Sequence, residues 1–333
     1  MKRIAIIISC LLMTVSYAQE SIEDLLTAGI NDTEQFLQSY LDPATDGLVY
    51  NLNNGWFNSG KSKKLFGFEI ALVANASFVK DGNDTFVLDI NDYENLRFQD
   101  PTITQQRVST AFGDVEGVSV IVEGPGGNNA VFDLPTGLGS ADINFIPSAF
   151  IQASVGLIKG VELKARFFPK VETDDVEAGL FGVGLQYDFT SLLPADKLIP
   201  IAISGLVAYT NLDATYDFSE SSIVSGSDQR LENSTTTWLF QAIGSTRLPV
   251  FNVYGGIGYI TGNSDTDLRG TYNVTSGAFA GDTLVDPLSI ENSVSGVRGT
   301  LGIKLKVGFF RFNADYTLAE FDNLSVGISF GFR

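Results

Sequence analysis

Charged side chains alternate with apolar ones along several segments of the chain, and they are the residues best equipped for chemistry. This alternation is clearest in 160–170 and 309–320. The charged residues that share one face on this pattern are Glu69, Glu162, Lys164, Arg166, Lys304, Lys306, Arg311 and Asp315. Two interpretations remain open: a salt-bridged network that fills a narrow interior, or a polar permeation path or ligand site.

The elements that carry these charges read as strands. The final segment, Asn323–Arg333, alternates strictly between large apolar residues and residues no larger than Asn. Its length matches the ~9–11 residues that a tilted strand needs to cross a bilayer. Ten segments are predicted as strands: 65–79, 142–157, 160–170, 177–190, 199–217, 234–247, 250–262, 294–307, 309–320 and 323–333. Their apolar faces indicate lipid on one side and a crowded interior on the other.

The lengths of the connections decide the fold class. All the long links follow odd-numbered strands, namely Lys80–Ala141, Val171–Val176, Phe218–Asn233 and Asn263–Ser293. Transmembrane barrels show this asymmetry, with short periplasmic turns and longer extracellular loops. The prediction is an all-β, transmembrane antiparallel β-barrel of about ten strands over 65–333. Its even strand count places both termini in the periplasm.

The chain before the barrel divides into two parts. Residues 1–18 have a charged start, an apolar run and a small-residue cleavage site, which is typical of a cleaved signal peptide for export through the inner membrane. Residues 19–60 are predicted to be an N-terminal helical or plug segment, with helix over 20–41 ended by Asp42-Pro43. The expected location is therefore the outer membrane.

The residues absent from the chain exclude several functions. There is no histidine, which removes His-based acid/base catalysis, Ser–His hydrolysis and His-ligated metals. The only cysteine, Cys10, lies in the predicted leader. With a formal net charge of -18, nucleic acid is not an expected partner. We predict no enzyme activity, no catalytic residues, no metal and no cofactor.

Short motifs before the first strand carry a resemblance. They are Leu41-Asp42-Pro43, Gly47-Leu48 and Asn53-Asn54-Gly55-Trp56. With the closing barrel, the chain resembles an uncharacterised Bacteroidota outer-membrane family of about this length. It is more distantly similar to the long-chain fatty-acid transporters of Gram-negative outer membranes, in which a small N-terminal hatch within the barrel controls the passage of hydrophobic compounds. The final strand also resembles the strand by which outer-membrane barrels are recognised for assembly.

The resemblance implies a function and a set of partners. The hatch candidates are Asn53, Asn54, Trp56 and Phe57; the two amides would meet lumenal charges, and the two rings would offer an apolar surface to a small hydrophobic ligand. The expected partners are outer-membrane lipid, lipopolysaccharide and the barrel assembly machinery. The expected function is a porin-like channel or transporter for small or hydrophobic compounds, gated by the hatch. The alternative is a structural or surface-adhesive barrel without transport.

Overall fold

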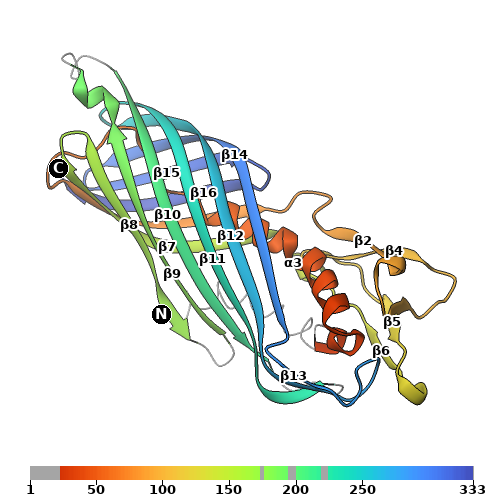
Figure 1. The fold of residues 1–333 in the computed structure, drawn as a ribbon. Coiled ribbons are helices and arrows are strands. Elements are labelled where there is room, and N and C mark those ends of the chain that lie inside the picture. Colours follow the sequence, from red (N-terminus) through yellow and green to blue (C-terminus); the bar gives the residue numbers. More distant parts are fainter. Residues whose placement is uncertain (1–22, 173–175, 194–199, 219–223, 333) are drawn as a thin grey trace.

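Ten antiparallel strands form a closed ring (Figure 1). The computed structural model describes residues 23–172, 176–193, 200–218 and 224–332, so the predicted signal peptide at 1–18 lies outside the described residues. Around the ring, the strands are β1 (Phe68–Phe78), β7 (Phe145–Ile158), β8 (Val161–Glu172), β9 (Val176–Asp188), β10 (Ile201–Asp217), β11 (Val224–Thr246), β12 (Phe251–Val274), β14 (Leu288–Val307), β15 (Phe310–Leu318) and β16 (Asp322–Phe332). This confirms the predicted barrel.

The ring closes where the first strand meets the last. β1 pairs with β7 on one side and with β16 on the other, and Phe68 lies opposite Phe332 across the second pairing. Closure satisfies the backbone groups that an open sheet edge would leave unpaired in hydrocarbon. The same pairing places the start of β1 and the end of β16 at the short-turn end of the barrel.

An apolar belt surrounds the barrel. Towards the short-turn end, the outward ring of Phe68 lies against the rings of Phe330 and Phe332, and Phe310 lies against Phe330. Towards the long-link end, Tyr209 and Trp238 lie 5.0 Å apart between ring centroids. One outward position further along each strand, the residues become polar: Asn211 on β10, Thr236 on β11, Thr261 on β12 and Ser295 on β14. The belt therefore ends at the aromatic row formed by Phe181, Tyr209, Trp238 and Tyr259.

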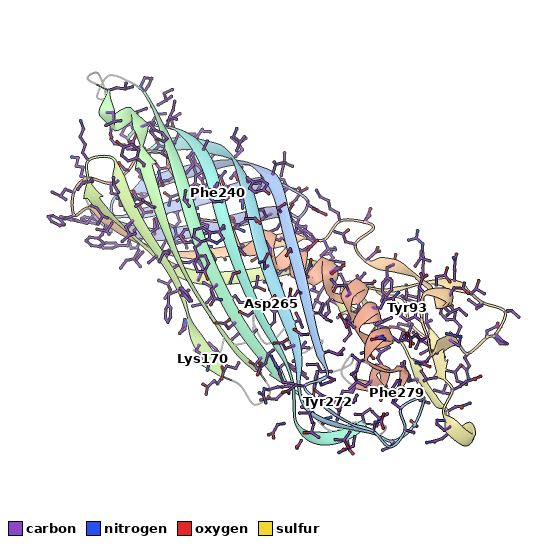
Figure 2. The ribbon with its side chains drawn as sticks, viewed as in Figure 1. Tyr93, Lys170, Phe240, Asp265, Tyr272 and Phe279 are labelled. Atoms are coloured by element: carbon purple, nitrogen blue, oxygen red, sulfur yellow. The ribbon has the colours of Figure 1, made fainter. Side chains whose placement is uncertain are left out.

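Three strands extend well beyond this belt. β11, β12 and β14 exceed their predicted ranges of 234–247, 250–262 and 294–307 at the long-link end. The prediction was too short because outward residues in the extensions are polar, so the apolar alternation stops while backbone pairing continues. Figure 2 shows Phe240 on the belt, Asp265 further along and Tyr272 near the far end.

The long link after β1 folds into a small outer domain. It contains β2 (Thr85–Asp89), β3 (Leu96–Phe98), β4 (Gln105–Ser109), β5 (Ser119–Val122) and β6 (Ala130–Asp133), with short 3-10 turns at Ile90–Asp92, Pro125–Gly127 and Leu138–Ala141. β2 pairs with β4, and β5 lies between β3 and β6. Two other short elements, the 3-10 turn Phe189–Leu192 and β13 (Thr283–Val285), belong to the barrel connections.

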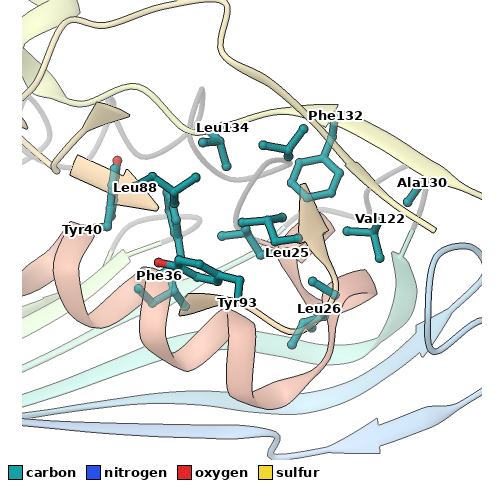
Figure 3. Close-up of a cluster of buried hydrophobic side chains, with 14 of the residues drawn as sticks. Leu25, Leu26, Phe36, Tyr40, Leu88, Tyr93, Val122, Ala130, Phe132 and Leu134 are labelled. Atoms are coloured by element: carbon teal, nitrogen blue, oxygen red, sulfur yellow. The ribbon is translucent and has the colours of Figure 1, made fainter. Parts of the chain in front are cut away.

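An N-terminal helix completes the core of this outer domain. The 3-10 turn Leu25–Ala28 and the first half of α3 (Ile30–Leu52) pack between the small sheets and the extensions of β11, β12 and β14. Figure 3 shows helix side chains such as Leu25 and Phe36 packed among loop side chains such as Leu88 and Phe132. The carboxylate of Asp32 accepts three backbone N–H groups of the loop, from Glu94, Asn95 and Leu96.

The structure corrects two expectations for this helix. Pro43 does not end it, because α3 continues to Leu52, with Pro43 inside. A proline costs a helix about 3 kcal/mol, but packing on both sides of Pro43 holds this one together, and the helix bends near that position (Figure 1). The helix also begins at the long-link end, whereas the strand count placed the N-terminus at the other end. The chain reaches β1 by running through the barrel.

In the described parts of the chain, none of the helices combines the length and the apolar character needed to cross a membrane.

The outward register of β16 generates a prediction. Ile328 is 54% exposed in the middle of the belt, opposite Leu72 and Phe312. Ile328→Arg should lower the free energy of unfolding in lipid by about 2–4 kcal/mol, measured by urea titration in vesicles, because a cation there meets hydrocarbon. Ser295→Arg, outward but beyond the belt, is the matched control and should change it by less than about 1 kcal/mol. Equal costs for both would contradict the position of the belt.

Candidate functional site

The second half of α3 and the segment that follows it fill the barrel. We call residues 44–64 the plug. Val49, Tyr50, Trp56 and Phe57 of the plug are buried against the inward side chains of β10, β11 and β12. The fit is close at Gly296, where a Cβ atom would lie 1.9 Å from the Tyr50 hydroxyl. The predicted hatch residues Trp56 and Phe57 are thus packed into the wall and present no open surface for a ligand.

A buried arginine holds the end of the plug helix from β8. Arg166 is 1% exposed, and its Nη1 donates to the Leu52 carbonyl at 2.7 Å while its Nη2 donates to the Asn54 carbonyl at 2.9 Å. Its guanidinium carbon lies 3.7 Å from the centroid of the Trp56 ring and 3.8 Å from that of Phe150. Ring stacking on both faces and the negative end of the helix dipole favour the charged group here.

A second arginine reaches the same helix end from β14. Arg298 Nη1 donates to the Asn53 carbonyl at 2.8 Å, and its Nη2 donates to Oδ1 of Asn54. The carbonyl groups at a helix C-terminus lack partners within the helix. Arg166 and Arg298 supply those partners in the middle of the barrel. The two predicted hatch amides therefore differ. The side-chain oxygen of Asn54 accepts from Arg298, whereas Asn53 contacts Arg298 only through its backbone carbonyl.

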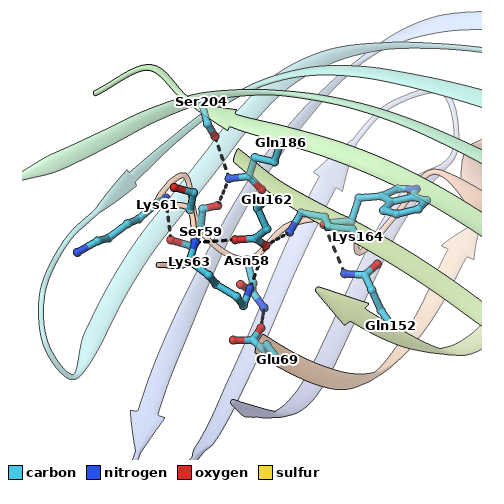
Figure 4. A network of polar contacts seen from close by, with 12 residues as sticks. Asn58, Ser59, Lys61, Lys63, Glu69, Gln152, Glu162, Lys164, Gln186 and Ser204 are labelled. Atoms are coloured by element: carbon cyan, nitrogen blue, oxygen red, sulfur yellow. Dashed lines mark hydrogen bonds and ion pairs between the residues drawn. The ribbon is translucent and has the colours of Figure 1, made fainter. Parts of the chain in front are cut away.

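Ion pairs gather at the short-turn mouth of the barrel (Figure 4). Glu162 is paired with Lys164 at 2.7 Å and with Lys63 of the plug at 2.9 Å. Glu69 is paired with Lys304 at 3.5 Å and with Arg311 at 3.3 Å. Each carboxylate thus bridges two cations, which is how buried charges are normally tolerated.

The predicted lumenal charges do not form one network. Glu69, Glu162, Lys164, Lys304, Lys306 and Arg311 line the mouth together. Arg166 lies deeper, at the end of the plug helix, and Asp315 accepts a hydrogen bond from the Tyr254 hydroxyl at 2.7 Å. Sequence reasoning missed Arg298 and Lys63. Arg298 and Lys304 are six residues apart and so lie on the same face of a strand. The alternation in 294–307 could therefore have predicted that Arg298 points inward.

Asp265 and Asp267 lie in the predicted link Asn263–Ser293, but in the structure they belong to the extended part of β12. Asp267 is paired with Arg269 at 2.7 Å, and both lie on β12. Over the described residues, no group of three or more Asp, Glu or Cys side chains converges in a way that could hold a metal ion.

A carboxylate of α3 lies where the plug meets the outer domain. Asp46 accepts a hydrogen bond from Nδ2 of Asn292 at 2.8 Å. Asn292 is on the part of β14 beyond Ser295, outside the apolar belt. Burial raises the pKa of Asp46 to about 6, with smaller contributions from nearby Glu320 and Asp42 and an opposing one from the Asn292 hydrogen bond.

Removing the deeper arginine should loosen the plug. Arg166→Gln leaves the Leu52 and Asn54 carbonyls without their charged donor, which should reduce the opening free energy of the plug by about 2–4 kcal/mol. Hydrogen exchange of the backbone amides in 48–56 measures this. Arg230→Gln, a half-exposed position on the extension of β11, is the control and should leave those amides protected. Unchanged exchange in Arg166→Gln would show that packing alone holds the plug.

The docking of α3 should depend on pH through Asp46. Its pKa of about 6 in the folded state exceeds the unfolded value of ~3.9, so docking is strongest below about pH 4 and weakens as the pH rises through about 6. The melting temperature of the outer domain, measured by calorimetry, should fall between about pH 4 and about pH 7, and this fall should be smaller in Asp46→Asn. Asp265→Asn, an exposed carboxylate on β12, is the control. An equal reduction in both variants would contradict the role of Asp46.

Comparisons with solved structures give barrels at low similarity. An outer membrane channel from Pseudomonas putida F1 is 8% identical, with 84% of this chain and 100% of that chain covered and a TM-score of 0.36. The translocator domain of autotransporter NalP from Neisseria meningitidis is 12% identical, with 96% of this chain and 99% of that chain covered and a TM-score of 0.30. Ail, the attachment invasion locus protein of Yersinia pestis, is 8% identical, with 80% of this chain and 100% of that chain covered and a TM-score of 0.26. Such scores carry no inference about function.

Sequence comparison is more specific. No curated protein matches the chain. A model of a protein family of unknown function matches residues 1–332, nearly the whole length. Because this match covers nearly the whole chain, the chain belongs to that family, DUF6588.

Proposed function

We propose that the protein is an outer-membrane channel or transporter for small or hydrophobic compounds, and that the plug must move for passage. The observation that carries the proposal is that α3 belongs to two cores at once. Its first half is part of the outer-domain core, and its second half fills the lumen. A ligand that shifts the outer domain would therefore pull directly on the plug.

The chemistry of the plug contact supports a separable interface. The indole nitrogen of Trp56, the side-chain amide of Gln241 and Oδ1 of Asn75 are buried without a hydrogen-bond partner in the described structure. Buried polar groups without a protein partner normally bond to water. An interface with such groups is easier to open than one that is fully paired.

The wall behind the plug supports an apolar path. The inward residues Leu206 and Ala208 of β10 and Leu239 and Ile243 of β11 are apolar and buried against the plug. Movement of the plug would expose this stripe to the lumen. A hydrophobic compound would follow it, while the charged mouth lies at the other end of the path.

A surface anchor without transport is the second candidate. It is favoured by the outer domain, which has a buried apolar core that rests on the extensions of three barrel strands. In this function, the plug only seals the barrel that carries the domain. Neither candidate uses enzyme chemistry.

A disulfide between plug and wall separates the two candidates. A Cβ atom at Gly262 would lie 2.8 Å from Cγ1 and 3.1 Å from Cγ2 of Val49, which brings the two Cβ atoms near the ~3.5–4.5 Å of a disulfide. Val49→Cys/Gly262→Cys in planar bilayers should show voltage-induced conductance steps when reduced and none when oxidised. The single variants, which cannot lock, are the matched controls and should conduct in both states.

An absence of conductance would instead support the surface anchor without transport. If the reduced protein and both single variants never conduct, and hydrophobic dyes do not cross vesicles that contain them, the plug is a permanent seal. Conductance that persists in the oxidised protein would place the path outside the contact between α3 and β12.

A further inference from the structure

A cavity of about 250 Å³ opens at the short-turn mouth of the lumen. Its walls come from the end of the plug and from inward positions of β1, β8, β14 and β15. At ~30 Å³ for each water of the liquid, it has the space of about eight water molecules. The lining side chains of the four strands point into the lumen, on the face opposite to the lipid-facing one, while Lys61 and Lys64 belong to the segment before β1 and are exposed.

Positive charge dominates this cavity. Seven cationic side chains line it against two carboxylates, a surplus of five positive charges in a chain whose net charge is -18. Three of the cations are lysines of the segment 61–64, and the others are Lys164, Lys304, Lys306 and Arg311. Both carboxylates, Glu69 and Glu162, are already shared between pairs of cations.

Three of the lysines are available to a ligand. Lys61 and Lys64 are exposed and Lys306 is half-buried, and none of them forms an ion pair with a carboxylate of the described structure. Lys306 lies near enough to Arg311 and to Lys61 to be repelled by both. Like charges held together in a partly enclosed space are stabilised by a bound counter-ion, and the attraction increases with the charge of that ion.

We propose that this cavity is a binding site for a soluble, multivalent phosphate-bearing anion. Phosphate oxygens suit the donors present, since lysine ammonium groups bind phosphate as point charges and Arg311 adds a planar fork. The inward direction of the lining side chains favours a soluble anion over a lipid headgroup. The proposal does not depend on movement of the plug, because the cavity is open in the plugged barrel.

Inorganic pyrophosphate is the probe, titrated calorimetrically into the full chain in neutral detergent micelles. The expected result is saturable binding that weakens as salt is raised from ~50 mM to ~500 mM. Lys61→Gln and Lys306→Gln should each reduce the affinity by about fivefold. These positions are chosen because Lys164 and Lys304 hold the buried carboxylates, so their loss would disturb the fold.

Lys159→Gln is the matched control. Lys159 lies in the turn between β7 and β8 at the same end of the barrel, but it does not line the cavity. Unchanged affinity in Lys159→Gln supports the site, and an equal loss there would overturn it in favour of diffuse surface charge. No saturable binding of pyrophosphate to the wild-type protein would also overturn it. So would retention of phosphatidylglycerol from mixed micelles that is lost in Lys61→Gln/Lys306→Gln, since this would assign the lysines to lipid headgroups.

Discussion

Two buried guanidinium groups hold the end of α3 in the middle of the barrel, and the arrangement of the whole molecule depends on that contact. Arg166 and Arg298 come from strands on different sides of the ring and meet the carbonyl groups of residues 52–54. Without them, the last turn of the helix would bury carbonyl groups with no donors, which costs about 1–3 kcal/mol for each group. The arginines therefore make it possible for a helix to end inside the barrel.

The position of that helix end also fixes the outer domain. Because α3 is continuous from Ile30 to Leu52, its first half must emerge from the lumen at the long-link end. There it needs apolar partners, and the extended strands and the link after β1 provide them. The extensions of β11, β12 and β14 and the folding of that link thus both accompany one helix that begins outside the lumen and ends within it.

The barrel was predictable from the sequence, and its contents were not. Outward faces obey a single rule, because lipid requires apolar side chains at every second position, so strands such as β16 can be recognised alone. The polarity of an inward residue depends instead on the part of the plug or wall that it contacts. Leu239 and Ile243 of β11 interrupt the alternation of apolar and polar residues, because they point inward and face an apolar part of the plug. Pro43 likewise indicates a helix end locally, and only packing with distant segments shows that the helix continues.

The distribution of charge gives the barrel a direction that neither the fold nor the net charge implies. The link after β1 carries ten carboxylates, whereas the cavity at the other end carries a surplus of cations. An anion is repelled at the first end and attracted at the second, and in low ionic strength such fields act over ~10–30 Å. Between the two ends lie the apolar stripe of β10 and β11 and the two arginines of the plug. In the proposed transport function, an anionic compound that enters from the mouth would meet its strongest attraction before it reaches the plug. An uncharged apolar compound would meet the apolar stripe only after the plug has moved. Under the proposed transport function, the same lumen would separate compounds by charge first and by polarity second.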